Sequence, residues 1–339
     1  MLAIFHSNIH KLFIQISFFI VALACTANQV AATEPKVKYL DNEPIVPIPD
    51  IPNDIDSDVI QLGKKLFTEP RLSANNTIAC INCHILSIGG VDGSVVSTGI
   101  NGKQGTRNSP SLYNISLHYK FFWDGRANSL EEQIDGPIHN PVEMASNWKD
   151  VILKLSQDEE YVRYFDRIYG QAINKENIIH AITSFEKTLL TPDSPFDRYL
   201  KGDFTAIDQP TREGYGLFKS YGCSSCHQGK LVGANMYEKI GVVKPFEWNL
   251  ASKHNIKPDY GRYNITGNEE HKFEFKVPSL RNVALTAPYF HNGSVKSLEV
   301  AVKLMGEYQL GRHIPDNDVD KIVLFLRSLT GKHPELMQN

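Results

Sequence analysis

The sequence predicts a mainly α-helical protein with two domains and long irregular loops. Apolar residues recur at helical spacing in several segments, whereas strand signals are few. A chain of 339 residues, 42% of them hydrophobic, is long enough for two domains that each bury a core. The pattern C-x-x-C-H occurs at residues 80–84 and again at 223–227, which puts one copy in each expected domain.

The two C-x-x-C-H signatures predict two covalently bound haem c groups. Two thiols one helical turn apart can reach both vinyl groups of one haem, and the adjacent histidine then binds the iron. A lone C-x-x-C pair can also be half of a zinc site or a redox dithiol. Four of the five cysteines lie in the two signatures, and both copies carry the histidine, so we favour two cytochrome c-like haem domains. The signatures are Cys80, Cys83 and His84, and Cys223, Cys226 and His227.

The first 32 residues predict an export signal. His and Lys residues precede an apolar run over residues 12–24, and the small residues at 30–32 offer a cleavage site. The run is short for a transmembrane helix. We expect export to the periplasm, with a lipid anchor through Cys25 as the less favoured alternative.

The mature chain begins with an arm and a helix. Residues 33–56 are rich in Pro and Asp, which predicts an extended arm outside the core. A helix is expected at 57–67, with Ser57 as its cap and Leu62 and Leu66 on its apolar face. A glycine-rich loop at 89–105 follows the first signature, where glycines let the backbone pass close to a flat cofactor.

Helical patterns continue to the end of the chain. Ser129 and Glu132 fit a capping box that begins one helix. The sequence Thr-Pro-Asp-Ser-Pro at 191–195 breaks the pattern, which predicts one haem domain at 33–196 and another at 197–339. Residues 230–277 show no sustained period and predict an irregular segment with room for a short hairpin. Further helices are expected at about 147–156, 158–169, 175–190, 210–221, 295–305 and 316–329.

Several segments resemble the bacterial di-haem cytochrome c peroxidase family, whose scaffold the MauG enzymes share. The resemblance implies an enzyme that reduces hydrogen peroxide to water with electrons from a small cytochrome c or cupredoxin. It also implies a homodimer, with the haem on His84 reacting with peroxide and the haem on His227 receiving electrons. A net charge of −3 gives no sign of nucleic-acid binding. The matching segments are Gly105–Pro110, Phe122–Ala127, Gly136–Ile138, Asn140–Met144 and Leu280–His291.

The resemblance assigns roles to individual residues. Glu143 matches the family's catalytic glutamate, Gln133 the amide beside it, and Trp123 the tryptophan between the haems. Met305 matches the axial ligand of the second haem, where a thioether raises the reduction potential, and Met236 is the rival methionine. The ordinary alternatives stay open, since Met305 could fill a helical core, Trp123 could be a core aromatic and Glu143 a loop carboxylate.

The resemblance also implies an inter-domain calcium. Asn108, Thr286 and Pro288 match the residues around it. Backbone and amide oxygens suit a hard cation, and the small number of carboxylates predicts modest affinity.

One position departs from the family pattern. Many members carry a distal histidine in the glycine-rich loop, where this chain has Ile100, which cannot bind iron. We therefore expect the first haem to be open, or to hold only water, in the oxidised protein. His118 and His139 follow later and are interpreted as surface or structural histidines.

Two competing functions remain at this point. A MauG-like enzyme that oxidises residues of a partner protein also keeps an open first haem, but it uses tyrosine as the distal ligand of the second. Here Met305 stands at the match, and Tyr308 is close by but out of position. A di-haem electron carrier is the other alternative, against which Glu143 and Gln133 argue.

Overall fold

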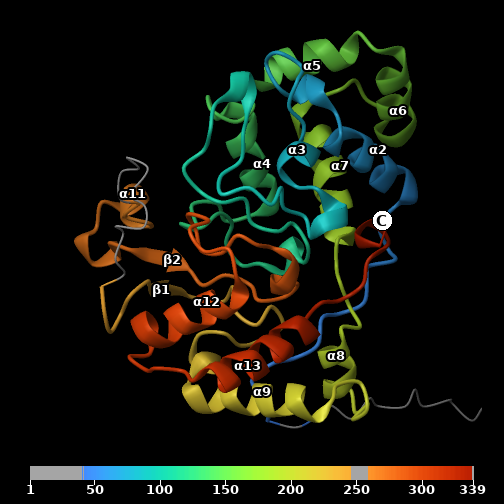
Figure 1. The fold of residues 1–339 in the computed structure, drawn as a ribbon. Coiled ribbons are helices and arrows are strands. Elements are labelled where there is room, and N and C mark those ends of the chain that lie inside the picture. Colours follow the sequence, from blue (N-terminus) through green and yellow to red (C-terminus); the bar gives the residue numbers. More distant parts are fainter. Residues whose placement is uncertain (1–39, 41, 246–258, 338–339) are drawn as a thin grey trace, which may run out of the picture. The chain divides into compact units, whose positions relative to one another are not determined.

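Helices make up most of the regular structure, as the sequence predicts (Figure 1). The computed structural model describes residues 40, 42–245 and 259–337, so the predicted export signal and Cys25 lie outside the described residues. No helix among the described residues has the length and apolar content needed to cross a membrane. The α-helices are α2 (Ser57–Phe67), α3 (Cys80–Cys83), α4 (Leu130–His139), α5 (Trp148–Ser156), α6 (Glu159–Tyr169), α7 (Lys175–Thr188), α8 (Pro195–Leu200), α9 (Gln209–Tyr221), α11 (Tyr263–Thr266), α12 (Leu298–Leu304) and α13 (Asp316–Ser328).

Two short strands replace the expected hairpin. Strand β1 (Tyr237–Lys239) pairs antiparallel with β2 (Glu274–Lys276), and Glu238 lies opposite Phe275. The strands belong to distant parts of the irregular segment, so no tight turn joins them. Helix α11 and a 3-10 turn at Glu269–His271 also lie in the segment 230–277, and the rest of its described residues are irregular, as predicted.

Helix α2 has the bounds that the sequence predicts, but its cap is different. Asp56 caps the helix by accepting a hydrogen bond of 2.8 Å from the backbone N–H of Asp58, whereas Ser57 is already helical. The apolar face packs against α7, and a Cβ atom at Gly63 would lie 1.9 Å from the carbonyl oxygen of Ala181. The two helices therefore approach closely because this position is glycine.

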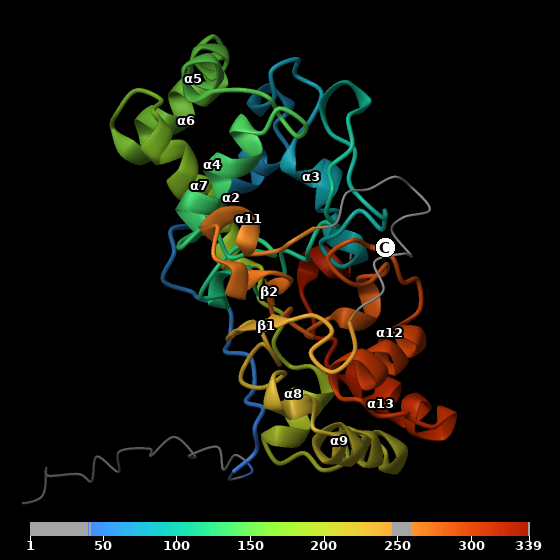
Figure 2. The same cartoon turned by 90° about the vertical axis from the view of Figure 1, so that its left-hand side faces the viewer.

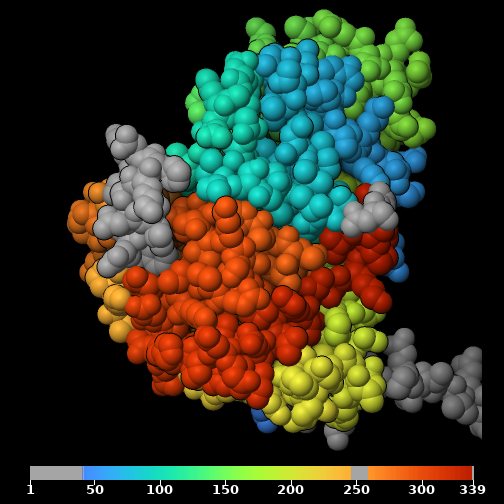
Figure 3. All heavy atoms as spheres, viewed as in Figure 1, coloured from blue at the N-terminus to red at the C-terminus, as the bar shows by residue number. Residues whose placement is uncertain are grey.

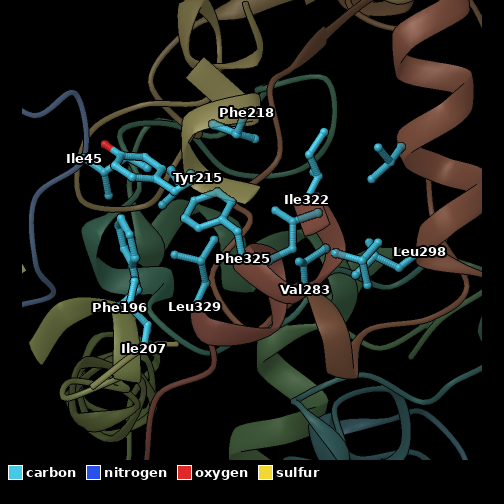
Figure 4. Close-up of a cluster of buried hydrophobic side chains, with 14 of the residues drawn as sticks. Ile45, Phe196, Ile207, Tyr215, Phe218, Val283, Leu298, Ile322, Phe325 and Leu329 are labelled. Atoms are coloured by element: carbon cyan, nitrogen blue, oxygen red, sulfur yellow. The ribbon is translucent and has the colours of Figure 1, made fainter. Parts of the chain in front are cut away.

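Two large buried clusters draw on different parts of the chain. The helices that contribute to them lie in different halves of the molecule in both views (Figures 1 and 2). One combines apolar side chains of α2 and α4–α7, and the other combines those of α8, α9, α12 and α13. In the second cluster, the centroid of the Phe196 ring lies 4.7 Å from that of Tyr215 and 4.9 Å from that of Phe325, in edge-to-face contacts (Figure 4). The described residues from Leu40 onward nevertheless form one compact unit, and the predicted domain division at 196/197 stays a prediction.

The arm before α2 is irregular as predicted, but its placement outside the core is wrong for two side chains. Ile45 and Ile48 are each only 1% exposed. The backbone N–H of Gly229 donates to the carbonyl of Pro44 at 2.7 Å, and the Arg281 guanidinium donates to the carbonyl of Val46 at 2.9 Å. These bonds hold the arm against the second half of the chain, so its apolar side chains point inward.

The predicted break at 191–195 contains the start of α8. Pro195 occupies the first turn of that helix, where a missing N–H costs nothing, and Ser194 caps it reciprocally with Asp197. Just before it, the hydroxyl of buried Thr191 accepts hydrogen bonds from Asn114 at 2.9 Å and from Asn282 at 3.0 Å. The connection is thus an ordered junction between three segments of the chain.

The start of α4 and the end of α12 differ in detail from the prediction. Ser129 caps α4 as expected, but the Glu132 carboxylate accepts from the N–H of Asn128 and not from that of Ser129, so the capping box is only half formed. Helix α12 ends at Leu304, and residues Met305–Gln309 form a π-helical turn. Single π-turns often accompany functional sites because they redirect one side chain.

The C-terminal half packs against the loops that follow the first signature (Figure 3). The backbone N–H of Asn108 donates to the carbonyl of His291 at 2.8 Å. A Cβ atom at Gly293, which has φ +61°, would lie 2.4 Å from the carbonyl oxygen of Val95. This close backbone contact brings the two haem signatures into one connected structure.

Candidate haem sites and the path between them

The first haem signature is a single helical turn, α3. The side chain of Asn82 accepts from the backbone N–H of Ala79 at 2.7 Å, and the N–H of His84 donates to the carbonyl of Cys80 at 3.0 Å. Nδ1 of His84 lies 3.1 Å from the carbonyl oxygen of Gly90, so Nδ1 carries the proton and Nε2 is free to bind iron. Burial lowers the pKa of His84, which keeps the imidazole in its metal-binding neutral form.

The second signature repeats this arrangement after α9. The N–H of His227 donates to the carbonyl of Cys223 at 3.0 Å, and Nδ1 of His227 lies 3.2 Å from the carbonyl oxygen of Val232. Burial lowers the pKa of His227 to about 4. A Cβ atom at Gly233 would lie 2.3 Å from the carbonyl oxygen of Pro278 and 3.1 Å from Nδ1 of His227. Glycine at this position therefore leaves room for the histidine to face the cofactor.

A cavity of about 290 Å³ lies over the second signature. Cys223, Cys226 and His227 line it together with Met305, whereas Met236 and Tyr308 are not among its lining residues. The thiols, the imidazole and the thioether thus share one mainly apolar cavity, which fits a haem c with histidine and methionine ligands. Apolar lining residues include Phe218, Ile240, Val283, Leu298, Val302 and Leu326.

Glu143 lies in the turn that follows α4. Its Oε1 accepts a hydrogen bond of 2.6 Å from the side-chain amide of Asn140. Burial raises the pKa of Glu143, although the charge of Arg126 and the bond from Asn140 act in the opposite direction. Burial raises the pKa of the Cys83 thiol most, and the charges of Asp92 and Glu143 raise it further. The carboxyl of Glu143 is therefore near the first signature.

The glycine-rich loop packs directly against this turn. The backbone N–H of Ile100 donates to the carbonyl of Glu143 at 2.8 Å, and the Ile100 side chain is 3% exposed. A Cβ atom at Gly99 would lie 2.1 Å from the carbonyl oxygen of Val142, so the two backbones touch only because residue 99 is glycine. Gln133 is half-buried on α4, whose C-terminal end leads into the same turn.

Trp123 connects the two halves of the site. Its indole Nε1 donates to the carbonyl of Asn108 at 2.9 Å, and its own carbonyl accepts from the N–H of Lys276 at 2.8 Å. Ser109, the residue after Asn108, has its hydroxyl oxygen 3.4 Å from Nδ1 of His84. Trp123 also lines the cavity that contains His227. The indole is therefore bonded to the residue that precedes Ser109, which contacts the first signature, and it borders the cavity of the second.

Comparisons with known proteins identify the family. A family model described as "Di-haem cytochrome c peroxidase" matches residues 57–205. The cytochrome c551 peroxidase of Nitrosomonas europaea is 44% identical over 295 residues, which cover 87% of this chain and 86% of the relative. The cytochrome c peroxidase Ccp of Escherichia coli (strain K12) is 46% identical over 88% of this chain, which spans 63% of that relative's length.

This chain belongs to the di-haem cytochrome c peroxidase family. Membership implies two haem c groups, in agreement with the two signatures, and places the chain among oxidoreductases that act on peroxide. More distant relatives include the methylamine utilization protein MauG of Methylorubrum extorquens, 31% identical over 74% of this chain and 69% of that protein. A solved structure of a MauG-like protein associated with microbial copper homeostasis matches with a TM-score of 0.73, at 26% identity over 88% of this chain and 98% of that one.

The residues that match the family's calcium site line the same cavity. Asn108, Thr286 and Pro288 all contribute to its wall, and the Asn108 side-chain N–H donates to the carbonyl of Ser94 at 2.9 Å. Among the described residues, no group of three or more His, Cys, Asp or Glu side chains could hold a metal ion. A calcium there would rely on backbone and amide oxygens, as the sequence predicts.

The structure extends the interpretation of two histidines. His139 is exposed on α4, in agreement with a surface histidine, and His118 is half-buried and lines the cavity, in agreement with a structural one. The role of Asn140 in holding Glu143 is also new. The only sequence signal for it is the spacing of three residues within a turn, which a polar side chain can span.

Proposed function

We propose that this chain reduces hydrogen peroxide to water with electrons from a small cytochrome c or cupredoxin. Two electrons and two protons convert one peroxide into two waters. The electrons would pass from a haem bound at His227 to a haem bound at His84. Relatives named cytochrome c peroxidase, at 44% and 46% identity, support this assignment.

Glu143 is the proton-transferring group in this proposal. A bound haem on the first signature supplies the iron that holds the peroxide. The Glu143 carboxylate takes a proton from the near oxygen and returns it to the leaving oxygen. The observation that carries this role is the half-buried carboxyl, held by Asn140 at 2.6 Å and with a pKa raised by burial. Gln133, on the adjoining helix, is proposed to hydrogen-bond the peroxide from the same side.

The first haem is proposed to be open in the oxidised protein. Ile100 fills the position of the family's distal histidine and is buried against the Glu143 turn. An aliphatic side chain offers no ligand to iron. The enzyme would then react with peroxide without prior reduction.

Met305 and Trp123 complete the electron path. A thioether ligand favours ferrous iron, so Met305 would make the second haem a ready acceptor of electrons from the donor. Its place in the cavity with His227, which Met236 does not share, supports this ligand. The indole of Trp123, bonded to Asn108 and bordering the same cavity, is proposed to relay electrons toward the first haem.

A MauG-like oxidation of a partner protein is the second candidate. The open first site and the MauG relative at 31% identity favour it. The ligand of the second haem argues against it, because Tyr308 is outside the cavity and has Lys244 stacked 5.0 Å from its ring. A residue so placed is not positioned to replace Met305.

Further features of the proposal concern location and assembly. The predicted export signal at 1–32 supports a periplasmic protein, and the presence of one C-x-x-C-H signature in each half of the chain supports one haem domain at 33–196 and another at 197–339. The family resemblance supports a homodimer and a calcium bound by Asn108, Thr286 and Pro288, whose common place in the cavity wall fits a shared ion.

Steady-state turnover tests the proposed function. The purified holoprotein should oxidise a reduced small cytochrome c when peroxide is added, with two cytochromes consumed per peroxide. An electron carrier would be reoxidised by peroxide slowly or not at all. Failure with cytochromes and cupredoxins, together with oxidation of a partner protein's residues, would instead favour the MauG-like function.

A further inference from the structure

The cavity over the second signature contains a buried lysine, Lys276. It lies on β2, is 7% exposed and lines the cavity together with Cys223 and His227. Among the described residues, no carboxylate forms an ion pair with it. Burial alone accounts for the lowering of its pKa to about 8. A buried ammonium without an acidic partner is costly, because buried charges normally need an opposite charge.

The partner that the chain does provide is a histidine. Nδ1 of His118 lies 2.6 Å from Nζ of Lys276, although the two residues are 158 positions apart. The ammonium donates to Nδ1, so the proton of the neutral imidazole sits on Nε2. Burial and the Lys276 charge both hold the pKa of His118 well below its ordinary value. His118 also lines the cavity, so the pair offers the two remaining N–H groups of Lys276, the Nε2–H of His118 and one positive charge to whatever the cavity holds.

The group that the cavity holds is itself acidic. Each haem c carries two propionate carboxylates, and the second signature attaches one haem in this cavity. A carboxylate that accepts from an ammonium in a dry site forms a short, strong hydrogen bond. We infer that Lys276, supported by His118, binds a propionate of the second haem. The inference rests on the haem that family membership implies and does not depend on the proposed peroxide reaction.

The position of Lys276 ties this contact to the electron path. Its backbone N–H donates to the carbonyl of Trp123 at 2.8 Å, and its strand pairs with Tyr237 on β1. A positive charge beside the second haem stabilises the added electron and so raises the reduction potential of that haem. The lysine therefore acts in the same direction as the thioether of Met305.

The test compares three variants of the holoprotein by redox titration and resonance Raman spectroscopy. Lys276→Gln removes the charge, and Lys276→Arg keeps it. Lys272→Gln is the matched control, because it removes the same charge from a half-exposed lysine on the same segment, which pairs with Glu269. Lys276→Met, of similar length and apolar, replaces the glutamine variant if that protein does not fold.

Loss of the charge should lower the reduction potential of the second haem. We expect at least a tenfold fall in the equilibrium constant for its reduction, about 59 mV for one electron. The propionate bending band of that haem should shift in Lys276→Gln and keep its position in Lys276→Arg and Lys272→Gln. Haem content should be unchanged in all variants.

Three results would overturn the inference. In the first, Lys276→Gln has an equilibrium constant for reduction of the second haem within twofold of the wild-type value, and its propionate band is unmoved. Another is an equal or larger shift at the first haem, which would place the contact at the wrong cofactor. The third is a shifted potential with an unmoved propionate band, which would mean that Lys276 acts only through its charge. The reduction potentials and the propionate band are all measured without peroxide turnover.

Discussion

The backbone N–H of Ile100 donates a 2.8 Å hydrogen bond to the carbonyl of Glu143. This bond fixes the glycine-rich loop against the turn that carries the proposed proton-transferring carboxyl. The residue that cannot bind iron and the residue proposed to move the proton are therefore held side by side through their backbones. The central proposal that builds on this pairing is that the first haem is open to peroxide in the oxidised protein.

Glu143→Gln should abolish peroxide turnover while both haems stay attached. The amide keeps the size of the side chain but cannot accept the proton, so we expect kcat/KM to fall by about 10²- to 10⁴-fold. Peroxide-dependent oxidation of reduced cytochrome c gives the rate, and the haem spectrum gives the content. Glu159→Gln is the control, since that side chain is 91% exposed. Equal activity of both variants would refute the role of Glu143.

The pH profile should show a limb set by Glu143. Because burial raises its pKa, the carboxyl becomes protonated at a higher pH than an exposed glutamate does. Only the ionised form is a base, so kcat/KM should fall as the pH drops through this raised pKa. Rates measured across the acid range should show the limb in the wild type but not in the residual activity of Glu143→Gln. A limb shared by both proteins would assign it to another group.

Ile100→His should close the first haem. An imidazole at this position can bind the iron, and a net preference of about 1.4 kcal/mol for the closed form would lower turnover about tenfold. We expect lower activity in the oxidised protein, with recovery after reduction of the second haem. Ile100→Leu keeps an apolar side chain and should retain activity. An active, unligated histidine variant would show that residue 100 does not face the iron.

Trp123→Phe should slow electron transfer between the haems. The substitution keeps an aromatic ring but removes the Nε1–H that bonds to the carbonyl of Asn108. Stopped-flow mixing of half-reduced protein with peroxide should show slower oxidation of the second haem, with peroxide binding unchanged. Trp148→Phe is the control, because that indole bonds to Asp135 and does not line the cavity. Equal effects of both substitutions would argue against a specific path through Trp123.

Sequence reasoning works best where one helix face is apolar. Leu62 and Leu66 lie at helical spacing and are fully buried, and their helix has the predicted bounds. It fails where tertiary contacts decide. Pro195 indicates a break but begins α8, and the burial of Ile45 depends on hydrogen bonds to residues more than 180 positions away, which no local pattern encodes.

The candidate site divides in the same way. The two signatures are local patterns, so the sequence alone predicts both haem attachments and both histidine ligands. Glu143 has no local signal, and only the family resemblance singles it out. The pair of His118 and Lys276 has neither, because it forms between residues that meet only in the folded cavity. Buried polar contacts of this kind are set by packing and not by periodicity.

Electron paramagnetic resonance of the as-isolated, fully oxidised protein tests the central claim most directly. An open first haem should give a high-spin ferric signal, and a second haem bound by His227 and Met305 should give a low-spin signal of equal intensity. Two low-spin signals without a high-spin component would contradict the account, because the first iron would then carry a strong sixth ligand despite Ile100.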